Sequence, residues 1–82
     1  MTQDDKLKIE NAVRDILQAI GENPERDGLK ETPDRVARML EELTSGYHED
    51  AKVHLAKTFD EIGSDAVIEK DIHFSSTCEH HL

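Results

Sequence analysis

Residues 3–20 carry the pattern that most constrains the fold of this chain. Apolar side chains recur there at steps of three and four, which predicts an amphipathic helix. The apolar positions are Ile9, Val13, Ile16, Leu17 and Ile20. Thr2 and Asp5 have the spacing of a helix-capping box, and Gly21 is a natural C-terminal stop. We therefore predict a helix over about residues 3–20 that must bury its apolar stripe against a partner.

A second amphipathic helix, over about residues 33–45, is the expected partner. Thr32 is a good N-cap residue, Pro33 suits the first helical position, and Gly46 is expected to end the helix. Its apolar stripe consists of Val36, Met39, Leu40 and Leu43. Residues 22–28 are mostly turn formers and predict a structured loop between the two helices. Residues 53–59 predict at most a short helical turn.

The following segment, residues 66–75, alternates between a mostly apolar and a mostly polar face. This period of two predicts a β-strand, preceded by a turn at residues 63–65. Within these 82 residues no second strand is evident, so the strand would need a hydrogen-bonding partner from elsewhere. The predicted fold class is α+β, mostly helical as the chain stands.

The charge and cysteine content exclude several classes of partner. The net charge is −9, and no Lys/Arg cluster is present, so we expect neither nucleic acid nor an anionic membrane to bind. A lone cysteine cannot form an internal disulfide, and the N-terminus lacks the features of a signal peptide. We expect a cytoplasmic protein. Because hydrophobic residues make up only 35% of the chain, its thin core should depend on further chain or on other subunits.

The final residues, Cys78-Glu79-His80-His81, contain thiolate and imidazole donors, which zinc prefers. In extended chain Cys78 shares a side with His80, whereas Cys78 and His81 meet only if the chain turns. Catalytic zinc typically has three protein ligands and a water, so either pair would be an incomplete site. The alternative is an exposed tail with a free thiol and solvated imidazoles. Spacing alone leaves these interpretations open.

Arg35 is unusual because it lies in the first turn of the second helix, where the helix dipole disfavours a cation. It either pairs with Glu31, four residues earlier, or joins the helix N-terminus in holding an anion such as a phosphate. Three other histidines, His48, His54 and His73, lie among charged residues, and we assign them no role.

Taken together, these motifs resemble the GTP cyclohydrolase I family. The matching segments, in order, are PERDGL at 24–29, TPDRVARM at 32–39, Gly46-Tyr47, KDI at 70–72 and STCEHH at 76–81. The likeness runs from about residue 7 onward. The combination of TPxRVAxM with a downstream CEHH is quite specific.

The resemblance implies a zinc-dependent enzyme that hydrolyses the guanine imidazole ring of GTP. The products would be 7,8-dihydroneopterin triphosphate and formate, in the first step of tetrahydrofolate and pterin biosynthesis. By motif, Cys78 and His81 would bind zinc, and His80 would be the catalytic acid/base. Arg35 would reach the GTP triphosphate across a subunit boundary. Glu79 would support the site without binding the metal itself.

The resemblance also implies a tunnelling fold (T-fold), in which family members self-associate into toroidal decamers. The family domain continues past CEHH, where it supplies the third zinc ligand and most of the triphosphate-binding residues. We therefore expect residues 1–82 to be the N-terminal part of one such domain and to be inactive alone. Two other hypotheses stay open: a non-catalytic helical module that binds or modulates a full-length subunit, and a metal store or sensor shared between chains.

Overall fold

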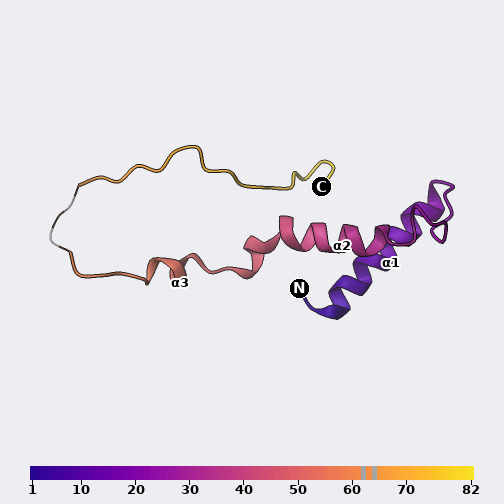
Figure 1. The fold of residues 1–82 in the computed structure, drawn as a ribbon, viewed down its shortest axis with the longest axis horizontal. Helices are drawn as coiled ribbons and strands as arrows, with labels where there is room; N and C mark the ends of the chain where they lie inside the picture. Colours follow the sequence, from indigo (N-terminus) through magenta and orange to yellow (C-terminus); the bar gives the residue numbers. More distant parts are fainter. Residues whose placement is uncertain (62, 64) are drawn as a thin grey trace.

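The computed structural model describes residues 1–61, 63 and 65–82 and shows a helical N-terminal part followed by extended chain (Figure 1). Its elements are α1 (Gln3–Ala19), α2 (Thr32–Leu43), the 3-10 helix η1 (Ser45–His48) and α3 (Ala51–Leu55). After α3 the chain doubles back, so that its C-terminal end lies beside α2. The molecule measures 63 × 26 × 23 Å. No helix in the described part of the chain is both long and apolar enough to cross a membrane.

Helix α1 begins and ends at the predicted signals. The Thr2 hydroxyl accepts a hydrogen bond from the Asp5 backbone N–H, and the Asp5 carboxylate accepts one from the Thr2 N–H, each at 3.1 Å. Gly21 has a φ of 93°, a left-handed conformation that glycine adopts without a steric penalty, and its N–H donates to the Gln18 carbonyl. The prediction of a helix over about residues 3–20 is confirmed.

Helix α2 begins one residue earlier than predicted. Thr32 lies inside the helix, and the N-cap position belongs to Glu31, whose side chain makes no capping hydrogen bond. The Glu31 carboxylate instead accepts a hydrogen bond from Arg35. Pro33 still lies in the first turn, where its missing N–H leaves no helical hydrogen bond unmade.

The prediction that Gly46 ends the second helix is wrong. Helix α2 ends at Leu43, and Gly46 lies inside η1. The backbone N–H and the hydroxyl of Thr44 both donate to the Leu40 carbonyl, at 3.0 and 2.6 Å, so the helix ends on a threonine without a glycine. The expected short helical turn is present as α3.

The packed part of the molecule is the contact between α1 and α2. Ala37 is only 1% exposed, and Lys6 Nζ of α1 lies 2.9 Å from Glu41 Oε2 of α2. The half-buried positions of the two stripes are Ile9, Val13, Leu17, Val36, Leu40 and Leu43. The stripes were expected to be buried against each other, but they are only partly buried: Ile16 is 58% exposed and Ile20 is 69% exposed. A single partner helix covers only one side of a wide apolar stripe.

The predicted strand over residues 66–75 is not formed. The structure assigns no strand to any described residue, because this segment runs without a neighbour that could pair with its backbone. Asp71 has a φ of 56°, in the left-handed region, and this interrupts the extended conformation midway. The apolar side chains of the segment, including Ile72 and Phe74, are exposed. The predicted turn at 63–65 includes Ser64, which lies outside the described residues.

Candidate functional site

The motif Cys78-Glu79-His80-His81 lies in a tight turn at the end of the chain. The Leu82 N–H donates to the Cys78 carbonyl at 3.0 Å, which closes the turn around the three residues between them. The imidazole rings of His80 and His81 have centres 6.3 Å apart and are inclined by 48°. The chain therefore adopts the turned arrangement, the one under which Cys78 and His81 can approach each other, rather than the extended one.

The turn also changes the chemistry of the thiol. Cys78 is free and exposed, and the backbone N–H of His81, followed by that of His80, lowers the pKa of its thiol. A lower pKa increases the thiolate fraction near neutral pH. The thiolate is the form of cysteine that binds metal ions and attacks electrophiles.

The donors of this turn suit zinc in kind but not in number. A thiolate and an imidazole are the softer donors that zinc favours, yet a catalytic site needs three protein ligands. Among residues 1–61, 63 and 65–82, no group of three or more His, Cys, Asp or Glu side chains is placed to hold a metal ion. The donors of this turn therefore do not form a complete zinc site among the residues that the structure describes.

Arg35 forms an ion pair with Glu31, as one of the two interpretations of its position predicted. Its Nη2 lies 2.8 Å from Glu31 Oε2, and both side chains are exposed. One turn further along, Arg38 and Asp34 form a matching pair at 2.9 Å. Exposed pairs of this kind contribute only about 0.3–0.5 kcal/mol. A bound polyanion could therefore displace Glu31 from Arg35 at little cost.

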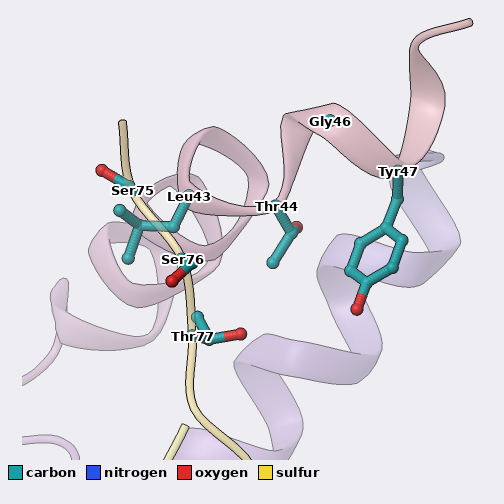
Figure 2. A pocket seen from close by; sticks show the side chains of 7 residues that line it. All are labelled: Leu43, Thr44, Gly46, Tyr47, Ser75, Ser76 and Thr77. Carbon is teal, nitrogen blue, oxygen red and sulfur yellow. The ribbon is translucent and has the colours of Figure 1, made fainter. Parts of the chain in front are cut away.

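A pocket of about 370 Å³ lies where the returning chain meets the end of α2 (Figure 2). Leu43, Thr44, Gly46 and Tyr47 line it from the helical side, and residues 75–77 line it from the returning segment. These residues were not among the predicted site residues. No local sequence pattern could have found them, because the contact joins segments about thirty positions apart.

The other histidines remain without a role in the structure. His48, His54 and His73 are all exposed, and in the part of the chain that the structure describes none belongs to a group that could hold a metal ion.

Comparison with known proteins assigns the family. The profile of the family described as GTP cyclohydrolase I matches residues 9–82. The GTP cyclohydrolase 1 proteins of Finegoldia magna and Pelotomaculum thermopropionicum are 62% and 63% identical over 78 residues, or 95% of this chain. That of Listeria monocytogenes serotype 4b is 56% identical over all 82 residues. The chain spans only 42–43% of the length of these relatives. With nearly all of its residues matched, the chain belongs to the GTP cyclohydrolase I family.

Proposed function

We propose that this chain is part of a zinc-dependent GTP cyclohydrolase I. The enzyme would open the guanine imidazole ring of GTP and yield 7,8-dihydroneopterin triphosphate and formate, the first step of tetrahydrofolate and pterin biosynthesis. The observation that carries the proposal is the turn at Cys78–Leu82, which holds a thiol of lowered pKa and two imidazoles in a chain of this family. The lone cysteine supports a cytoplasmic location.

In the proposed site, the Cys78 thiolate and the His81 imidazole hold zinc. When bound, zinc supplies a hydroxide near neutral pH. His80 would give and take the protons that the nitrogens of the opening ring exchange, because an imidazole has one nitrogen that donates a proton and one that accepts it. Glu79, between the ligands, orients them by hydrogen bonding or charge. The third protein ligand comes from outside these 82 residues.

Arg35 is the proposed contact to the triphosphate of GTP. An arginine at a helix N-terminus combines a guanidinium with the positive end of the helix dipole, and both attract phosphate. Its exposed pair with Glu31 leaves the guanidinium accessible to a substrate held by a neighbouring subunit. We propose that the whole protein self-associates, as a decamer, to bring Arg35 to that substrate.

Metal titration tests the candidate site directly. We expect the 82-residue chain to bind Zn²⁺ or Co²⁺ weakly through two donors and to lose that binding in Cys78→Ser and in His81→Ala. His73→Ala, which replaces an exposed histidine outside the turn, is the matched control. Metal binding that survives Cys78→Ser unchanged would contradict the proposed site.

Turnover is a separate test of completeness. Because two donors are one short of a catalytic zinc site, purified 82-residue chain should release no formate from GTP. Formate or dihydroneopterin triphosphate produced at an appreciable rate would show that these residues suffice, and the assignment of a missing ligand would be wrong.

The exposed apolar residues of the helix pair favour a second candidate, a helical module that binds or modulates a full-length subunit. Ile16, Ile20 and Met39 are each about half exposed or more, and they would be covered in such a complex. Size-exclusion chromatography with the Finegoldia magna relative distinguishes the candidates. Co-elution that is lost in Ile16→Asp and kept in Cys78→Ser would favour the module.

A further inference from the structure

Thr77 occupies an unusual position in the returning segment. Of the described residues after Thr44, it alone is half-buried, and all others are exposed. Figure 2 shows residues 75–77 crossing the end of α2, with the Leu43 side chain beside Ser75 and Ser76 and the Thr44 side chain on the same side as that of Thr77. This is the place where the extended chain regains contact with the helices.

We propose that the end of α2 is a seat for the metal motif, and that Leu43 and Thr77 are positioning residues for the ligand Cys78. The seat is defined as the pocket residues Leu43, Thr44, Gly46 and Tyr47 together with residues 75–77. The proposal rests on the zinc site of the proposed function, because it explains how that site is held in place.

The covalent geometry supports a positioning role. Cys78 directly follows Thr77, so consecutive Cα atoms are about 3.8 Å apart and the thiol cannot move far once Thr77 is seated. Between α3 and the seat, every described residue is exposed and offers no other anchor. Without the seat, the contact at Thr77 would no longer restrict where the turn at 78–82 lies relative to α2.

The seat is also built to be firm on its helical side. The Thr44 hydroxyl is committed to the Leu40 carbonyl at 2.6 Å, and Leu43 and Thr44 are half-buried. The apparent metal affinity of Cys78 depends on the fraction of molecules in which residues 75–77 are in the seat, and a firm seat keeps that fraction high. Loss of the seat therefore weakens metal binding without touching a ligand.

The first test is structural and needs no metal. Cys78 is the only cysteine, so a nitroxide attaches to it without further substitutions. We expect paramagnetic broadening of the Thr44 and Gly46 amide signals, reversed by Thr77→Gln and unaffected by the matched exposed change Thr58→Gln. Sharp Thr44 and Gly46 signals in the labelled parent chain would overturn the proposal.

The second test follows Co²⁺ binding by the thiolate-to-cobalt absorption band. Thr77→Gln and Leu43→Ala should each raise the Kd about 3- to 10-fold, whereas Thr77→Val, which keeps the shape of the side chain, should stay within about 2-fold of the parent. Leu55→Ala, at an exposed leucine of α3, is the control for Leu43→Ala. Circular dichroism checks the helices, and Thr77→Gln remains decisive if Leu43→Ala unfolds them.

The spin-label test and the Co²⁺-binding test together distinguish an error in the positioning role from an error in the proposed zinc site. Unchanged Kd values in both Thr77→Gln and Leu43→Ala, with Cys78→Ser abolishing binding, would overturn the positioning role and leave the proposed metal site intact. Binding that is insensitive to Cys78→Ser would remove the zinc site, and with it the positioning role. The spin-label arm would then still report whether the contact itself exists.

Discussion

Ala37 offers the sharpest test of the helix pair on which the rest of the molecule depends. It is 1% exposed, on the face of α2 that meets α1. Ala37→Leu adds three carbon atoms where the partner helix leaves no solvent-filled space. Overpacking of this kind costs about 1–3 kcal/mol. Leucine and alanine differ little in helix propensity, so this cost measures packing alone.

The loss converts into a measurable shift in melting temperature. For a chain of 60–100 residues, 1 kcal/mol lowers the Tm by about 4–8 °C, so Ala37→Leu should lower it by roughly 5–20 °C. Circular dichroism melting of the 82-residue chain gives the readout. Ala12→Leu, the same change at an exposed position of α1, should lie within about 0.5 kcal/mol of the parent.

Refutation would be simple to recognise. If Ala37→Leu and Ala12→Leu melt together with the parent chain, Ala37 is not enclosed by α1 in solution. A second pair of variants tests the same packing in case the helices shift to accommodate the larger leucine side chain. Ala37→Gly loses about 0.8 kcal/mol of methyl burial in addition to the ~1 kcal/mol cost in helix propensity. Ala12→Gly should lose only the propensity cost. Equal losses in the two glycine variants would contradict the packing as well.

Three further predictions concern charge and ionisation. The lowered pKa of the Cys78 thiol means that alkylation by iodoacetamide should reach half its maximal rate at a lower pH in the native chain than in urea; equal midpoints would exclude the backbone N–H effect. Glu31→Gln should tighten binding of tripolyphosphate about 2- to 3-fold by freeing the paired guanidinium, whereas Asp34→Asn, from the matching pair, should not; equal effects would point to net charge alone. The Lys6 hydrogen bond lowers the pKa of Glu41, so its stabilisation is present above the unfolded carboxyl pKa and is lost as the pH falls through the folded pKa. Lys6→Met should therefore lower the Tm at pH 7 and leave it unchanged near pH 2, and a pH-independent difference would contradict this.

The parts of the fold that could be predicted are those encoded locally. The capping pair Thr2 and Asp5, the stop at Gly21 and the apolar period between them lie within a few residues of the contacts they make. The prediction of a strand over residues 66–75 was wrong for the opposite reason, because a strand depends on contacts outside its own segment. A strand exists only when a second strand pairs with it, and the conformation of Asp71 shows how the backbone departs from extension when nothing holds it there.

The candidate site was predictable in its chemistry but not in its geometry. Residue types alone indicated a thiolate and imidazole site, while spacing could not choose between His80 and His81 because that choice depends on whether the chain turns. The hydrogen bond from Leu82 to the Cys78 carbonyl decides that the chain turns. The pocket that Leu43 and Thr77 both line could not be predicted from the sequence, because only the path of the chain between them brings the two segments to one place.

Helix α2 connects two parts of the proposed chemistry. Arg35 lies in its first turn and Leu43 at its last residue, so eight residues at 1.5 Å each separate them by about 12 Å along the axis. Hydrogen bonds between successive turns fix the backbone of α2, whereas residues 66–75 belong to no helix or strand. If Leu43 seats the metal motif of its own chain, the orientation of α2 also sets where Arg35 points. Because α1 still holds α2, a change at Thr77 should then alter metal affinity alone, whereas a change at Glu31 should alter only tripolyphosphate affinity.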